Sequence, residues 1–311
     1  MKTKPLIPTI LCLLSSSLLS SEKFTITRPL MGTTFTITTH APDQQTAANA
    51  ARQAFSTAAK LEKTASDYLP SSELSLLSSL KPNTPKKLSP ELFTLLQTSR
   101  DLARKTQGRF DPTLGPLTKL WRESRHTKTL PKPETLAAAH TSTGWEKFTL
   151  NPKTQTITLT ASGMSFDLGG IAKGHAADLM LAIMKENGLP RTSITAGGEV
   201  RLGDPPPNRS GWNVGLKTTS TQKPDRILTL KNCAISTSGD LHQFIEIQGQ
   251  RHSHILNPKT GLGLQNQIAT TIIAPNATLS DALATAASNT APKDLPTLAK
   301  TFQVKILSSQ P

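Results

Sequence analysis

The stretch that decides the fold is D-L-G-G-I-A-K-G-H-A-A-D-L-M, residues 167–180. A glycine pair here stands between a carboxylate and an amphipathic helix. Such a pair lets the backbone approach a ligand, and the N–H groups at the helix start favour an anion. The stretch matches neither the dinucleotide fingerprint G-x-G-x-x-G nor the G-K-[ST] of a P-loop. Taken alone, it predicts either a strand-to-helix turn that holds a phosphate or a tight turn that only packs well.

The composition fits a soluble globular protein. The 311 residues are 36% hydrophobic and 18% charged, which suits one large domain or two fused lobes and excludes collagen, coiled coil and wholesale disorder. The formal net charge is +14, but the basic residues are scattered in ones and twos with few aromatic residues among them. We therefore expect no nucleic-acid partner, and a surface that favours anionic ligands or, peripherally, membrane headgroups.

Residues 1–22 have the layout of a signal peptide or an N-terminal anchor. Lys2 and Lys4 precede an apolar run over residues 6–19, which is short for a membrane span. Acylation at Cys12 is a weaker alternative, because Leu11 before it is larger than a lipoprotein processing site usually accepts. The leader predicts an exported protein, in a bacterial periplasm or at the outer face of the inner membrane. Without the leader only Cys233 remains, so no intramolecular disulfide is expected.

Strand patterns outnumber helix patterns and often follow one another directly. Strands are expected near residues 24–39 (two runs), 154–160, 227–230, 243–247 and 268–273. Helices are expected near 43–63, 89–108, 172–188 and 278–289, the second with Ser89 as N-cap. The order predicts an α+β fold with a mostly antiparallel mixed sheet flanked by helices, in two closely packed lobes.

Three further stretches carry side chains suited to chemistry. In T-L-S-D-A-L-A-T-A, residues 278–286, Asp281 and Thr285 share one helix face and could hold a hard cation such as Mg²⁺, or could merely cap and pack. In R-H-S-H, residues 251–254, His252 and His254 alternate, so one is a candidate general base and the other a surface residue. I-S-T-S-G-D, residues 235–240, is expected to follow a strand as a pocket wall or a loop.

The order of these motifs resembles the ApbE family of flavin transferases. M-G-T, a Ser-x-Tyr segment, F-D-P-T-x-G-P-L-x-x-L-W and D-L-G-G-I-A-K-G are followed by A-G-G-E-V, I-S-T-S-G-D, H-I-L-N-P-K-T-G and S-D-A-L-A-T-A. The resemblance runs from about Arg28 to Asn289 and implies one ApbE-like domain over residues 24–307. It implies an Mg²⁺-dependent FAD:protein FMN transferase, which moves FMN from FAD to a Ser or Thr hydroxyl of an exported or membrane-bound redox protein and releases AMP.

The resemblance also implies the site residues. Those for FAD are Met31, Tyr68, Phe110, Asp111, Asp167, Lys173 and Ile255. Those for Mg²⁺ are Gly170, through its backbone carbonyl, together with Asp281, Ala284 and Thr285. Asp281 and His254 are the catalytic candidates, with His254 placed to take the proton of the acceptor hydroxyl or to support the phosphate.

Two other functions stay open at this stage. Some ApbE members also hydrolyse FAD to FMN and AMP, so an FAD pyrophosphatase that uses water in place of a protein hydroxyl is one alternative. A flavin-storage protein is the other, although Asp281 and Thr285 argue against it, because a pure binder has no need of a metal at the pyrophosphate.

Overall fold

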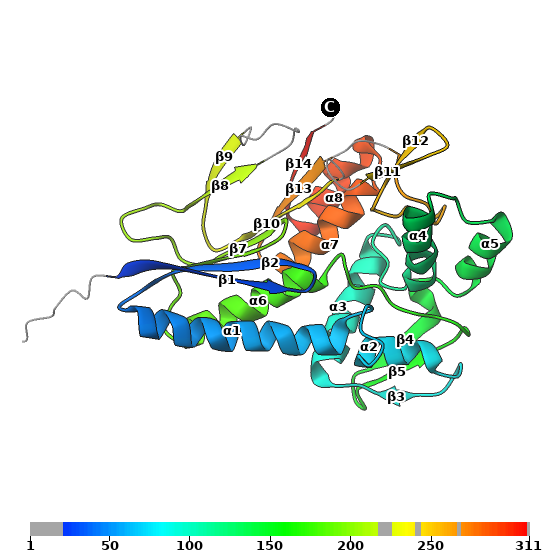
Figure 1. Cartoon of the computed structure of the whole chain (residues 1–311), viewed down its shortest axis with the longest axis horizontal. Coiled ribbons are helices and arrows are strands. Elements are labelled where there is room, and N and C mark those ends of the chain that lie inside the picture. Colours follow the sequence, from blue (N-terminus) through cyan, green and yellow to red (C-terminus); the bar gives the residue numbers. More distant parts are fainter. Residues whose placement is uncertain (1–20, 217–225, 240–243, 266–268, 310–311) are drawn as a thin grey trace, which may run out of the picture.

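The structure is a computed structural model that describes residues 21–216, 226–239, 244–265 and 269–309. Residues 1–20, which make up nearly all of the expected leader, lie outside this range. A seven-stranded sheet forms the centre, in the order β1-β2-β6-β7-β10-β13-β14 (Figure 1). Each described pairing within it is antiparallel, which confirms the expected sheet type.

The strands of the described chain are β1 (Glu22–Leu30), β2 (Thr33–Ala41), β3 (Lys86–Lys87), β4 (Phe148–Asn151), β5 (Thr156–Leu159), β6 (Thr192–Ala196), β7 (Glu199–Leu202), β8 (Trp212–Leu216), β9 (Arg226–Leu230), β10 (Ala234–Ser238), β11 (Phe244–Ile247), β12 (Gln250–Ser253), β13 (Ala269–Ala274) and β14 (Lys305–Ser309). The α-helices are α1 (Gln44–Ala65), α2 (Glu73–Leu76), α3 (Pro90–Lys105), α4 (Gly115–Thr127), α5 (Pro133–Thr141), α6 (Ala172–Glu186), α7 (Ala277–Ser288) and α8 (Leu295–Phe302).

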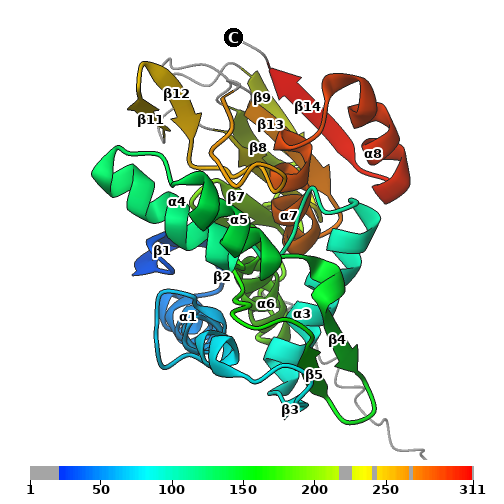
Figure 2. The same ribbon diagram turned by 90° about the vertical axis from the view of Figure 1, so that its right-hand side faces the viewer.

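Helices α1, α6 and α7 flank the large sheet, and their apolar faces form the main core with β2 and β6 (Figure 1). A small sheet, β3-β5-β4, lies beside α2 and α3. Helices α4 and α5 run below the β11–β12 hairpin (Figure 2). Among the described residues, no helix has the length and apolar character that a membrane crossing needs.

Local sequence signals account for several element boundaries. Met31 and Gly32 both take a positive φ, of 51° and 69°, which is the two-residue turn that matches the twist of a β-hairpin. Asp43 caps α1, since its Oδ1 accepts from Thr46 N at 2.7 Å. Ser89 caps α3 in the same way, and Gly108, with φ of 76°, follows the end of that helix. The two strands expected over residues 24–39 and both helices are thus confirmed, and the two strands pair as a hairpin.

Two expectations about the polar motifs are wrong. Residues 164–168 belong to no strand, so the glycine turn follows an irregular segment, held where Asp167 N donates to Pro112 O at 2.8 Å. The I-S-T-S motif does not follow a strand but lies within β10, paired with β7 and β13 on either side. Its short hydroxyl side chains suit that inner position because neighbouring elements supply hydrogen-bond partners, as when Ser236 meets Ser280 of α7 at 2.7 Å.

Helices α6 and α7 cross at very short distance at Gly174. A Cβ built on Gly174 would lie 2.1 Å from Ala277 O and 2.7 Å from Asp281 Cβ. Only glycine therefore allows this approach, and α6 is buried toward α7 as well as toward the sheet. The sequence pattern, which assigned α6 a single buried face, underestimated this burial.

Because the two helices are so close at Gly174, a substitution that helix propensity favours should destabilise the protein. Gly174→Ala should destabilise the protein by about 1–3 kcal/mol through overpacking, although alanine is favoured over glycine in a helix by about 1 kcal/mol. Ala182→Ser, at an exposed position of the same helix, is the control and should change the free energy of unfolding by less than about 0.5 kcal/mol. Urea unfolding measures both, and a stabilised Gly174→Ala variant would refute the close crossing.

Candidate functional site

Two side chains, those of Asp167 and Lys173, fix the conformation of the glycine turn. Asp167 Oδ1 accepts from Gly169 N at 2.8 Å, which closes the turn, and Lys173 Nζ donates to Gly169 O at 3.0 Å from the first turn of α6. Ile171, the N-cap of α6, makes no side-chain capping bond. The start of α6 is instead capped by Asp281 of α7, whose Oδ2 accepts from Gly174 N at 2.9 Å. A carboxylate is favoured at this end of the helix dipole.

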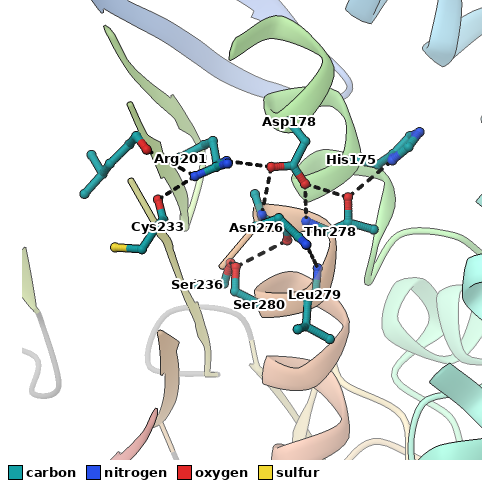
Figure 3. A network of polar contacts seen from close by, with 11 residues as sticks. His175, Asp178, Arg201, Cys233, Ser236, Asn276, Thr278, Leu279 and Ser280 are labelled. Carbon is teal, nitrogen blue, oxygen red and sulfur yellow. Dashed lines mark hydrogen bonds and ion pairs between the residues drawn. The ribbon is translucent and has the colours of Figure 1, made fainter. Parts of the chain in front are cut away.

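Helix α7 is capped in return by α6. Asp178 Oδ1 accepts from Ala277 N at 2.9 Å, and its Oδ2 accepts from Thr278 N at 2.8 Å and from Thr278 Oγ1 at 2.7 Å (Figure 3). Arg201 Nε donates to Asp178 Oδ1 at 2.7 Å and ties this pair of helices to β7. Asp281 and Thr285 stand one and two turns further along α7, so this network sets their position relative to the glycine turn.

Gly170 and Thr285 face each other directly. A Cβ on Gly170 would lie 2.8 Å from Thr285 Oγ1, so the backbone of the turn reaches the hydroxyl only because a side chain is missing. Asp281 and Ala284 are both buried. A carboxylate, a hydroxyl and a backbone carbonyl are hard oxygen donors of the kind that Mg²⁺ takes in proteins. The residues present therefore fit this ion.

No group of three histidine, cysteine or carboxylate residues suited to a metal occurs in the described part of the chain. A cation at α7 would be held by the Asp281 carboxylate together with the Thr285 hydroxyl and the Gly170 carbonyl, which are donors that suit a hard cation.

Glu199 of β7 is a residue of this site that the sequence analysis did not single out. Its Oε1 lies 3.6 Å from Lys173 Nζ, its side chain is 7% exposed, and its Oε2 has no hydrogen-bond partner among the described residues. Burial and repulsion from Asp281 raise the pKa of Glu199 to about 8, against the opposing effect of Lys173. The signal was present in A-G-G-E-V, where an acidic residue follows the two glycines.

Lys173 is the positive centre of this group. The Asp281 carboxylate raises the pKa of the Lys173 ammonium, with smaller contributions from Glu199 and Asp167, so Lys173 is charged at neutral pH. Lys173, Glu199 and Asp281 thus come together from α6, β7 and α7. A bound cation would find the Asp281 carboxylate here, and a bound phosphate would find the Lys173 ammonium beside it.

A second group gathers Tyr68, Asp67 and Asp167 around Arg122 of α4. The Arg122 Cζ lies 3.9 Å from the centroid of the Tyr68 ring, and its Nη2 lies 2.6 Å from Asp67 Oδ2. The same nitrogen lies 3.9 Å from Asp167 Oδ2. Two predicted FAD-binding residues are therefore joined through an arginine that the sequence analysis missed, although it directly follows the L-W of a quoted motif.

Phe110 and Asp111 occupy supporting positions. Phe110 is buried, and Asp111 accepts from Thr113 N at 2.8 Å through Oδ1 and from Trp145 N at 3.2 Å through Oδ2. Burial raises the pKa of Asp111, and these hydrogen bonds oppose the rise. The next carbonyl, that of Pro112, anchors the glycine turn. Direct contact of Phe110 and Asp111 with FAD stays a prediction.

The expectation that one histidine of R-H-S-H lies at the surface is wrong for His252. This side chain is 1% exposed and its ring centroid lies 5.5 Å from that of Trp121, because the β11–β12 hairpin packs on α4. His254 lies just past the end of β12 and is partly buried. It precedes Ile255 and Leu256, and Leu256 O accepts from Asn289 Nδ2 at 3.1 Å at the end of α7. His254 thus belongs to a segment fixed beside the helix that carries Thr285.

Met31 takes its place through the hairpin turn. Its N–H donates to Glu62 Oε1 of α1 at 3.0 Å, and its side chain packs against the main core while partly exposed. A cavity of about 550 Å³ lies between α3, α6 and α7, lined by His175, Asp178, Arg201 and Thr278 among others. None of the residues predicted to bind FAD or metal lines it.

Comparisons with known proteins agree with the motif order. The profile of the ApbE family matches residues 31–307. The FAD:protein FMN transferase of Chlamydia muridarum (strain MoPn / Nigg) is 33% identical over 224 residues, which are 71% of this chain and 69% of that protein. The enzyme of the same name from Treponema pallidum (strain Nichols) is 31% identical over 231 residues, 69% of this chain. The match spans 64% of the length of the T. pallidum protein.

Two solved structures share the fold. The ApbE protein of Thermotoga maritima MSB8 is 27% identical with a TM-score of 0.83, covering 92% of this chain and 94% of that one. The flavin transferase ApbE of Vibrio cholerae is 26% identical with a TM-score of 0.80, and the match covers 93% of each chain. The α+β arrangement described above is thus the one found in these proteins.

The raised pKa of Glu199 predicts a pH dependence of stability in metal-free protein. Between pH 4.5 and about 8 the folded state holds a proton that the unfolded state has lost, so this group makes stability fall as pH rises. The contribution is at most about 1.4 kcal/mol per pH unit. Glu199→Gln should remove it, and unfolding curves with a chelator present at pH 5, 6.5 and 8 measure it. Identical pH slopes in the two proteins would contradict the assignment.

Proposed function

The chain belongs to the ApbE family, and on that basis we propose that it transfers FMN from FAD to a Ser or Thr hydroxyl of a target redox protein and releases AMP. The observation that carries the proposal is the meeting of Gly170, Lys173 and Asp281 with Thr285 where α6 crosses α7. The names of the curated relatives support the same activity.

The proposed reaction breaks the phosphoanhydride bond of the FAD pyrophosphate and forms a phosphoester bond to the acceptor hydroxyl. The acceptor hydroxyl oxygen attacks the phosphorus of the FMN half of FAD, and the bond from that phosphorus to the bridging oxygen breaks. AMP leaves with the bond electrons, and the hydroxyl proton goes to a base, for which His254 is the candidate. FAD and the protein hydroxyl thus give the FMN-modified protein and AMP, with no oxidant or reductant needed.

Residues of this chain would act by stabilising the charge on the FAD pyrophosphate and by orienting that group. Lys173, kept charged by Asp281, would contact the pyrophosphate, and the backbone at Gly169 and Gly170 allows that group to come close. Asp281, Thr285 and the Gly170 carbonyl would hold Mg²⁺, with Ala284 behind them. When bound, Mg²⁺ would neutralise charge on the pyrophosphate oxygens. Met31, Tyr68, Asp167 and Ile255 would line the rest of the FAD site.

We further propose that the enzyme works outside the cytoplasm, on subunits of exported or membrane-bound redox complexes. The layout of residues 1–22 supports export, and the net charge of +14 supports peripheral association with an anionic membrane surface. Fractionation of cells that express the full chain, with and without a salt wash, tests both points.

One assay separates transfer from the alternatives. Purified protein is incubated with FAD, Mg²⁺ and a flavin-acceptor domain, and the mixture is run on a denaturing gel while AMP is quantified. Fluorescent acceptor together with AMP release is the expected result. AMP and free FMN without a labelled band would instead indicate FAD hydrolysis, and unchanged FAD would indicate storage.

Removal of the Asp281 carboxylate should abolish labelling. Asp281→Ala and Asp281→Asn are each expected to lower the transfer rate about 100-fold or more, because both lose an anionic oxygen donor. Asp281→Asn keeps an oxygen that can accept from Gly174 N, so its thermal unfolding should stay close to that of the wild type.

The matched control is Asp101→Asn, at an exposed position of α3, which should label the acceptor at the wild-type rate. A fully active Asp281→Asn enzyme would refute the proposed metal site. Equal loss in the control would show that the assay reports general damage.

A further inference from the structure

Arg122 occupies the junction of the second side-chain group, and neither the family resemblance nor the motif analysis assigned it a role. Its guanidinium covers one face of the Tyr68 ring at 3.9 Å while pairing with Asp67 at 2.6 Å and reaching Asp167 at 3.9 Å. A planar guanidinium suits this combination, because it stacks on an aromatic face and donates in its own plane.

The position of Arg122 is set by its neighbour in α4. Trp121 is 2% exposed, and its Nε1 donates to Ser253 O at 3.1 Å, which fixes the helix against the segment that leads to His254. The Arg122 side chain is one-third exposed, and those of Asp67 and Asp167 are about one-fifth exposed. The three charges are therefore partly removed from water and interact more strongly than at an open surface.

Without Arg122, Asp67 would lose its ion pair while the repulsion from Asp167 remained. Burial and the charge of Asp167 raise the pKa of Asp67, and the guanidinium opposes that rise. The same guanidinium covers one face of the Tyr68 ring, and the side chain is 72% exposed. A large aromatic ring that is held on one face and open elsewhere can receive a planar ring by stacking.

We propose that Arg122 is a positioning residue for FAD, holding the Tyr68 ring as a stacking platform and the Asp167 carboxylate at the edge of the glycine turn. The planar group on the platform is one of the two ring systems of FAD, the isoalloxazine or the adenine. This inference rests on the proposed function, since it takes FAD as the ligand. It adds a residue that acts through Tyr68 and Asp167 rather than on the reacting phosphorus.

The test is a double-mutant cycle in FAD binding, with the dissociation constant measured by the quenching of flavin fluorescence. Arg122→Ala should weaken binding about 10-fold or more, and Arg122→Lys, which keeps the charge but not the planar group, should fall in between. Tyr68→Ala should weaken binding as well. The loss of affinity in the double variant should be clearly smaller than the product of the two single losses, because the two residues act together.

The control is Arg125→Ala, an exposed arginine in the last turn of α4, which should bind FAD like the wild type. Thermal unfolding of every variant shows whether the fold is kept. If Arg122→Ala does not fold, Arg122→Lys replaces it in the cycle, and its FAD affinity decides. Wild-type affinity in the folded Arg122 variant, or independent effects of Arg122 and Tyr68, would overturn the inference.

Competition with FMN and with AMP identifies the ring on the platform. An Arg122-dependent loss of FMN binding assigns the isoalloxazine and a loss of AMP binding assigns the adenine, whereas no change for either contradicts the platform. Failure of the proposed function would show in the transfer assay instead, where the wild type and Arg125→Ala would leave the acceptor domain unlabelled while still binding FAD.

Discussion

The reciprocal capping of α6 and α7 is the interaction on which the rest of the site depends. Asp178 of α6 accepts from the first N–H groups of α7, and Asp281 of α7 accepts from Gly174 N in the first turn of α6. The two helices run in opposite directions at this crossing, so each supplies the anion that the other's N-terminal dipole favours. The missing side chain of Gly174 lets them approach closely enough for both contacts to form.

This arrangement explains how charge is concentrated without being neutralised. Asp281 serves as a helix cap and also holds the Lys173 ammonium charged, while Glu199 is pushed toward its protonated form beside them. Buried groups whose pKa values are shifted in this way are typical of sites that bind or transform charged ligands. A pyrophosphate with a divalent cation would complete the charge balance that the protein leaves open, which links the helix crossing to the proposed transfer of FMN.

Short-range patterns were sufficient to predict much of the fold, because caps and turns are written in adjacent residues. The Ser89 cap of α3 and the two strands expected over residues 24–39 are examples. The site residues came from the order of motifs, and their assignment to FAD and Mg²⁺ stays a prediction. Contacts distant in sequence could not be predicted: the stacking of Arg122 on Tyr68, the approach of Glu199 to Lys173, and the burial of His252 against Trp121 all depend on tertiary packing.

A crystal structure of the protein with FAD and Mn²⁺, the metal located by anomalous scattering, tests the central claim most directly. The account predicts a metal peak in contact with the Asp281 carboxylate, Thr285 Oγ1 and the Gly170 carbonyl, with the FAD pyrophosphate bound to the same ion beside Lys173. A metal bound elsewhere, or a pyrophosphate remote from the crossing of α6 and α7, would contradict it.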